Sequence, residues 1–135
     1  FLQLRVRYED TDFGGIVYHT RHLSFMERGR SSFIRILGFP NEELIKTNLI
    51  LVVSKAEIKW IRQLKIGTLI NIETKLIKLK RFSLSIFQRI KDYKDSRIYS
   101  EGHFRVASIN SNGKITKLNK NLFESLEKFV CLTID

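Results

Sequence analysis

A short acidic stretch near the N-terminus holds the residues most suited to chemistry. Three carboxylates fall within four positions, two glycines follow, and a histidine comes seven residues after the last acid. The stretch reads Tyr8-Glu9-Asp10-Thr11-Asp12-Phe13-Gly14-Gly15-Ile16-Val17-Tyr18-His19. A carboxylate can act as a nucleophile or general base, and a histidine can transfer protons near neutral pH. By spacing alone, such a cluster is more often a solvated turn, so both interpretations stay open.

A helix from about Arg21 to Leu37 is predicted directly after this stretch. Its apolar residues follow helical spacing, and Gly38 and Pro40 mark its end. The unpaired N–H groups at a helix N-terminus favour negative charge and can polarise a substrate carbonyl, and this helix would place them beside His19. Gly29 lies inside the helix, where glycine costs about 1 kcal/mol against alanine unless close packing requires it.

The rest of the chain has the patterns of strands joined by tight turns. Alternating apolar residues predict strands over residues 2–8, 55–60, 70–76, 84–90 and 104–106, with a polar segment at 41–48 and turns at 65–67, 80–81, 94–96 and 112–113. Asn121 and Glu124 resemble a capping pair for a short helix that carries Leu122, Leu126 and Phe129. Because tight turns favour antiparallel pairing, we expect an α+β fold in a single domain over residues 1–135.

Composition limits the class of protein but does not choose a partner. The formal net charge of +10 is compatible with binding nucleic acid or a phosphate-bearing ligand, and equally with a Lys-rich solvated surface. A single cysteine, Cys131, excludes an intrachain disulfide and a cysteine metal cluster, and it suits a reducing compartment. No 18-residue apolar run is present, so we expect no membrane insertion and a cytoplasmic protein.

The acidic stretch resembles a family signature. Asp12-x-x-Gly15-Ile16-Val17-Tyr18-His19, followed by Glu27-Arg28-Gly29-Arg30, is similar to the pattern of the 4-hydroxybenzoyl-CoA thioesterase family, in particular its Tol–Pal-associated acyl-CoA thioesterases. The likeness is dense over residues 6–30 and weaker in the second half of the chain. It implies a hot-dog fold, in which an antiparallel sheet wraps around one long central helix. It also implies a homodimer or homotetramer with active sites at the subunit boundary.

The resemblance also implies roles for individual residues. In this family the aspartate that matches Asp12 attacks the thioester carbonyl or activates water to do so, with His19 in the same site. The resemblance therefore implies Asp12 and His19 as catalytic residues, and the candidate substrate-binding residues are Tyr8, Gly15, Val17, Tyr18, Lys80 and Arg81. The last two would dock the phosphates of coenzyme A, although a basic turn is the simpler interpretation. No metal or cofactor is expected, since coenzyme A is part of the substrate.

Three segments depart from the family pattern. Arg21-His22 stands where Asn-Tyr is usual, and Gly29 stands where alanine is common. The turn Leu64-Lys65-Ile66-Gly67-Thr68 stands where many relatives have an Ala-Arg-x-Gly-Asp-like turn. The altered helix entry leaves the preferred acyl group open. We expect His22 at the surface or at the rim of a pocket.

Three functions are compatible with the sequence. The leading hypothesis is hydrolysis of an acyl-CoA or of an acyl carrier protein thioester. A hot-dog dehydratase acting on 3-hydroxyacyl thioesters is an alternative, but its histidine motif differs from this one. A non-enzymatic basic interaction protein or nucleic-acid-binding protein would explain the charge and leave the spacing of Asp12 and His19 without a purpose. We therefore expect no nucleic-acid partner.

Overall fold

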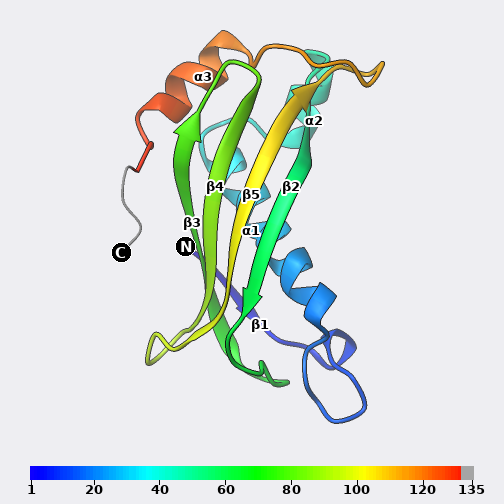
Figure 1. The fold of residues 1–135 in the computed structure, drawn as a ribbon, viewed down its shortest axis with the longest axis vertical. Helices are drawn as coiled ribbons and strands as arrows, with labels where there is room; N and C mark the ends of the chain where they lie inside the picture. The colour runs from blue at the N-terminus through cyan, green and yellow to red at the C-terminus, as the bar shows by residue number, and fades with distance from the viewer. Residues whose placement is uncertain (132–135) are drawn as a thin grey trace. The chain divides into compact units, whose positions relative to one another are not determined.

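The chain folds into one sheet and a small number of helices. The computed structural model describes residues 1–131 (Figure 1). The elements are β1 (Leu2–Arg5), a 3-10 turn η1 (Tyr8–Asp10), α1 (His19–Ile36), α2 (Asn41–Lys46), β2 (Ile50–Trp60), β3 (Leu69–Leu79), β4 (Ser83–Asp92), β5 (Ile98–Ile109) and α3 (Lys120–Glu127). The five strands form an antiparallel sheet in the order β1-β3-β4-β5-β2, which confirms the α+β prediction. None of the helices in residues 1–131 is long and apolar enough to span a membrane.

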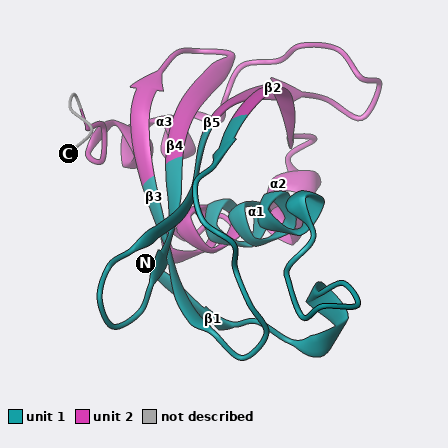
Figure 2. Cartoon of the chain, turned by 60° about the horizontal axis from the view of Figure 1, so that its bottom comes forward, with its two compact units in different colours: residues 1–30, 58–74, 88–102 teal, residues 31–57, 75–87, 103–135 magenta. Residues whose placement is uncertain are grey.

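Two compact units divide these elements (Figure 2). Unit 1 comprises Phe1–Arg30, Ile58–Thr74 and Gln88–Gly102, and unit 2 comprises Ser31–Glu57, Lys75–Phe87 and the chain from His103 onward. Helix α1 and strands β2 to β5 contribute residues to both units. Each unit therefore has its own share of helix and sheet. The expectation of a single domain over residues 1–135 stays a prediction.

The core of unit 1 packs the first part of α1 closely against β3 and β4. Gly29 is buried, and a Cβ atom there would lie 2.7 Å from Cγ2 of Ile72. The fully buried amide of Gln88 donates to the carbonyl of Met26 at 2.8 Å and to Oγ1 of Thr74 at 2.9 Å. Buried polar groups are stable when paired in this way. The close packing accounts for a glycine inside the helix.

The core of unit 2 is an apolar cluster whose buried members come from α1, α2, α3, strands β3, β4 and β5, and the segments between them. Its buried members are Ile34, Leu44, Leu49, Leu76, Leu84, Ile86, Val106, Leu118, Leu122 and Leu126. Within the polar segment expected over residues 41–48, Asn41–Lys46 forms helix α2, which the sequence pattern did not predict, and its Leu44 is buried. Pro40 precedes the helix with its ring-fixed φ, and Glu42 and Glu43 lie in the first turn, where the helix dipole favours acids.

The first strand is shorter than the alternation predicts. β1 ends at Arg5, and the chain leaves the ladder through Val6, whose N–H donates to Thr68 and whose carbonyl accepts from Gly67. The N–H of Arg7 then donates to the carboxylate of Asp10 at 2.9 Å. This bond turns the chain into η1 and brings the acidic stretch out of the sheet.

The last helix begins earlier than predicted. The N-cap of α3 is Asn119, so the expected capping pair of Asn121 and Glu124 is wrong. The Asn119 amide donates to Oγ1 of Thr47 at 2.8 Å and does not cap the helix. Leu122 and Leu126 are fully buried as expected, whereas Phe129 lies beyond the end of α3 and is 47% exposed.

Candidate active site at the turn before the main helix

The acidic stretch folds into a tight reversal of the chain in unit 1. Thr11 and Val17 form an antiparallel bridge, and within it the N–H of Asp12 donates to the carbonyl of Ile16 at 2.8 Å. Gly15 closes the reversal by donating to the carbonyl of Asp12 at 3.1 Å, with a φ of +76°. L-residues with a side chain rarely adopt that conformation. The structure thus gives Gly15 a shaping role in the turn.

The turn fixes the side chain of Asp12 through one oxygen only. Oδ1 accepts hydrogen bonds from the N–H groups of Gly14 at 2.9 Å and Ile16 at 3.1 Å. Oδ2 makes no hydrogen bond to any other residue that the structure describes. The side chain is half-buried. The carboxylate is therefore held in a set orientation with one oxygen available to a ligand.

The other two acids of the stretch have different surroundings. The Glu9 side chain is 68% exposed and lies 4.0 Å from Arg7. Asp10 is buried, and its Oδ1 lies 2.7 Å from Nε of Arg21 in an ion pair. Asp10 is a structural residue that the sequence interpretation did not separate from Asp12. Its partner Arg21 is one of the departures from the family pattern, and the arginine at this position neutralises the buried Asp10 carboxylate.

The predicted aromatic and histidine residues surround the start of α1. The helix begins at His19, whose ring meets that of Trp60 edge to face with centroids 5.0 Å apart. Nε1 of Trp60 also donates to the carbonyl of His19 at 3.2 Å. Tyr8 and Tyr18 are exposed, at 79% and 53%. No hydrogen bond joins Asp12 to His19 among the described residues.

A cavity of about 210 Å³ opens beside this turn. Its wall consists of Ile16, Val17, His19, His22, Trp60, Ile61, Arg62, Gln63 and Leu64, all in unit 1. The exposed lining residues include His19, Trp60 and Ile61, and we call this part of the wall the mouth. The buried lining residues are Val17, His22 and Leu64, and we call this part of the wall the floor. Val17 and His19, both predicted site residues, thus border one cavity.

His22 is the polar group on the floor of that cavity. It is only 3% exposed, so the expectation of a surface position is wrong, although the ring does line a pocket. Its Nδ1 lies 2.8 Å from Oγ of Ser100, across 78 residues of sequence. Burial, and to a lesser extent the neighbouring His19, lowers the pKa of His22 to about 4. The imidazole is therefore neutral at physiological pH.

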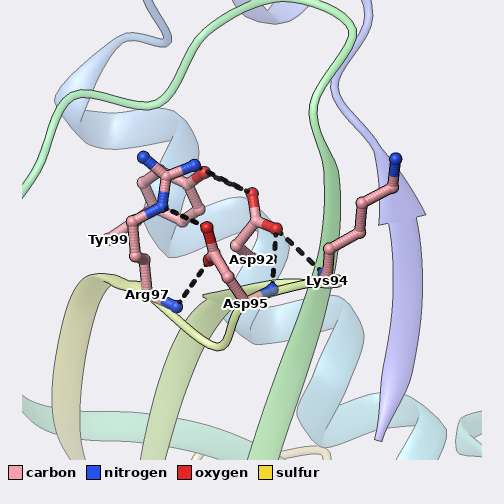
Figure 3. A network of polar contacts seen from close by, with 5 residues as sticks. All are labelled: Asp92, Lys94, Asp95, Arg97 and Tyr99. Atoms are coloured by element: carbon pink, nitrogen blue, oxygen red, sulfur yellow. Dashed lines mark hydrogen bonds and ion pairs between the residues drawn. The ribbon is translucent and has the colours of Figure 1, made fainter.

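A polar network lies at the β4–β5 turn (Figure 3). The hydroxyl of Tyr99 donates to Oδ2 of Asp92 at 2.7 Å, and Oδ1 of Asp92 accepts from the N–H of Lys94 at 2.9 Å. Burial, together with this bond to Asp92, raises the pKa of Tyr99 to about 12. The carbonyl of Tyr99 accepts from the N–H groups of Ile61 at 2.8 Å and Arg62 at 3.1 Å. The network thus anchors the segment that forms the cavity mouth.

The predicted phosphate-binding residues belong to unit 2. Lys80 and Arg81 lie at the β3–β4 turn, where the N–H of Lys80 donates to the carbonyl of Ser83 at 2.8 Å. Lys80 borders a hollow of about 440 Å³ whose other basic lining residues are Lys55, Lys78, His103 and Arg105. Arg81 borders a separate hollow with Lys117 and Lys120. Their role toward coenzyme A stays a prediction. Over residues 1–131, no group of three or more His, Cys, Asp or Glu side chains is arranged to hold a metal ion.

Comparison with known proteins identifies the class to which this fold and turn belong. The sequence profile of the thioesterase-like superfamily matches residues 6–126. The chain belongs to this superfamily, and its structural neighbours confirm the hot-dog fold.

Individual relatives narrow the class. The chain is 34% identical to the acyl-CoA thioesterase YbgC of Haemophilus influenzae over 107 residues, which cover 78% of this chain and 77% of that protein. It is 36% identical to a probable thioesterase of Bartonella henselae, with a TM-score of 0.83 and coverage of 87% and 97% of the two chains. A hypothetical Staphylococcus aureus protein solved in complex with CoA shares the fold, with a TM-score of 0.90, coverage of 99% and 86%, and 13% identity.

Proposed function

We propose that this chain hydrolyses acyl-CoA thioesters and that Asp12 is the reacting group. The observation that carries the proposal is the state of the Asp12 carboxylate, with Oδ1 held by two backbone N–H groups and Oδ2 without a partner among the described residues. The family membership and the relatives named as acyl-CoA thioesterases support the choice of substrate. They favour hydrolysis over dehydration of a 3-hydroxyacyl thioester or a purely binding role.

The reaction needs a nucleophile and a polarised carbonyl. A thioester is an activated acyl group, so Oδ2 of Asp12 can attack its carbonyl carbon directly or can take a proton from an attacking water. Either route breaks the carbon–sulfur bond and releases coenzyme A as the thiol. In the direct route water then cleaves the anhydride formed with Asp12. The first N–H groups of α1 have no partners within the helix and would polarise the carbonyl.

The remaining site residues would hold the substrate. His19 and Val17 border the cavity beside the turn. Tyr18 and Tyr8 are exposed and would contact the substrate outside this cavity. Lys80 and Arg81 would pair with the phosphate groups of coenzyme A. An acyl carrier protein thioester presents the same bond to Asp12 without the nucleotide phosphates. A cytoplasmic location suits such substrates and a reduced Cys131.

We also propose that the protein acts as a homodimer or homotetramer. β2 is an edge strand of the sheet, and most of its eleven residues are exposed. A long exposed edge is a template for pairing with another strand. A second copy that pairs there would extend the sheet. Light scattering coupled to size exclusion measures the mass directly, and a monomer at assay concentration contradicts the proposal.

The test compares two acids of the same turn. Asp12→Asn keeps an oxygen that can accept the two backbone hydrogen bonds but removes the negative charge. We expect it to lower kcat/KM for an acyl-CoA by about 10² or more, which is the usual contribution of such a group. Glu9→Gln, the matched control at an exposed position, should retain wild-type turnover. Unchanged circular dichroism would show that both variants fold.

Two results would count against the proposal. Normal turnover by Asp12→Asn removes this residue from the mechanism, and loss of water from a 3-hydroxyacyl-CoA without thiol release indicates a dehydratase. A single turnover in ¹⁸O-labelled water tests for direct attack. Label in the Asp12 carboxylate requires direct attack, with water cleaving the anhydride at the aspartyl carbonyl, whereas activation of water places label only in the released acid.

A further inference from the structure

The floor of the cavity carries a polar group that the proposed hydrolysis does not require. Of its three buried lining residues, Val17 and Leu64 are apolar and His22 is polar. The imidazole is held by Ser100, which is fully buried and lies on the strand that follows the β4–β5 turn. A buried polar side chain with a fixed orientation at the end of a cavity is suited to ligand recognition.

The hydrogen bond between Ser100 and His22 determines the tautomer of His22. Oγ of Ser100 has Nδ1 of His22 as its only partner among the described side chains. If Nδ1 carried the proton, the Ser100 hydroxyl hydrogen would be buried without an acceptor, which is costly. If the hydroxyl donates to Nδ1, both groups are satisfied. The proton of the neutral ring then lies on Nε2, on the side of the ring away from Ser100.

We propose that His22, oriented by Ser100, is a specificity-determining hydrogen-bond donor that selects acyl groups carrying an acceptor oxygen over plain hydrocarbon acyl groups of the same size. The inference rests on the proposed thioesterase function and extends it to the acyl group. Ser100 is a positioning residue that acts through His22. Burial also keeps the ring neutral, so Nδ1 remains an acceptor for the Ser100 hydroxyl across the physiological pH range.

The volume of the cavity limits the acyl group that reaches this donor. A volume of 210 Å³ is the share of about seven water molecules in the liquid. A short branched or hydroxylated chain, or a single ring, fills such a space, whereas a long fatty acyl chain does not. The Tyr99 carbonyl holds the backbone of Ile61 and Arg62 at the mouth, and the next residue, Ser100, sets His22 at the floor. One segment of β5 therefore holds residues in both the exposed and the buried part of the cavity wall.

The proposal is tested by the ratio of the kcat/KM values for two substrates. Butyryl-CoA and 3-hydroxybutyryl-CoA differ by one oxygen, and kcat/KM for thiol release is measured for each with the full chain. We expect the wild type to favour the hydroxylated substrate by about tenfold, the effect of one hydrogen bond. His22→Phe should bring the ratio to about one because it fills the space without a donor. Ser100→Ala should lower the ratio because the ring loses its partner, and Ser24→Ala, an equal truncation on α1, should not.

A second measurement reads the tautomer directly. The ¹⁵N chemical shifts of the His22 ring distinguish protonation at Nε2 from protonation at Nδ1. We expect Nε2–H in the wild type and a mixture in Ser100→Ala. A ring protonated at Nδ1, or a substrate ratio unchanged by His22→Phe, overturns the proposal while leaving hydrolysis intact. Failure to release thiol from either substrate overturns the proposed function, and this inference with it.

Discussion

Replacing Gly29 with alanine tests the packing between α1 and the sheet in unit 1. Alanine is common at this position in the family that the sequence resembles, so the substitution looks harmless. In this chain, however, a Cβ atom would lie 2.7 Å from Cγ2 of Ile72, 2.9 Å from Nε2 of Gln88 and 3.2 Å from Oγ1 of Thr74. The first two distances are shorter than real Cβ contacts allow, so a neighbour must move.

Two opposing free energies decide the outcome. Alanine gains about 1 kcal/mol over glycine in a helix interior. Overpacking a close-packed core costs typically 1–3 kcal/mol, and here it would also displace a Gln88 amide that donates to Met26 and Thr74. We expect Gly29→Ala to lower the free energy of unfolding by about 1 kcal/mol. The melting temperature should fall by about 3 °C in a chain of this size.

Thermal and urea unfolding of the wild type and Gly29→Ala measure this difference. Ile72→Leu supplies the control because it removes the Cγ2 branch that the new Cβ would meet and keeps the side-chain volume. In that background Gly29→Ala should cost less, and the double-mutant cycle gives the coupling between the two positions. A rise in melting temperature in Gly29→Ala would refute the packing argument, as would a coupling of zero.

Two further predictions concern pH and the cofactor portion of the substrate. Because the pKa of His22 is lowered from 6.5 to about 4 in the folded chain, the unfolded chain binds the extra proton between these values, and stability falls as pH falls from 6.5 to 4. The resulting loss in the free energy of unfolding is no more than about 3 kcal/mol. Urea unfolding at pH 7.5 and 4.5 should show this loss in the wild type but not in His22→Phe. Lys80→Ala should raise KM for an acyl-CoA several-fold and leave KM for the corresponding acyl-pantetheine unchanged, since that substrate lacks the nucleotide phosphates; equal effects on both would contradict a phosphate contact.

The elements with regular periodicity were predictable from the sequence. The long helix and four long strands carry enough apolar residues at fixed spacing to set their type. Helix α2 was missed because six residues with one buried leucine, Leu44, show no period. The early end of β1 was missed because alternation continues to Tyr8, while the bond between Arg7 and Asp10 ends the strand. The spacing of apolar residues does not show that a side chain such as Asp10 can accept a backbone hydrogen bond in place of a neighbouring strand.

The candidate site was predictable only in the part that is contiguous in sequence. The turn from Tyr8 to His19 combines glycines, acids and a histidine, and these residue types suggest chemistry before any fold is known. The groups that complete the cavity come from distant positions. Ser100 lies 78 residues from His22, and Trp60 lies 41 residues from His19. Without covariation between homologues, nothing in one sequence links such pairs.

Arg21 and His22, the two adjacent departures from the family pattern, act on different parts of the site. Successive helix residues point about 100° apart, so the two side chains leave α1 in different directions. Arg21 pairs with the buried Asp10 and so stabilises the turn. His22 faces Ser100 and the cavity. Asp12 is held by backbone N–H groups of its own turn and shares no hydrogen bond with His22 among the described residues. The group that selects the acyl chain can therefore vary while the reacting carboxylate keeps its geometry, because separate contacts hold the two.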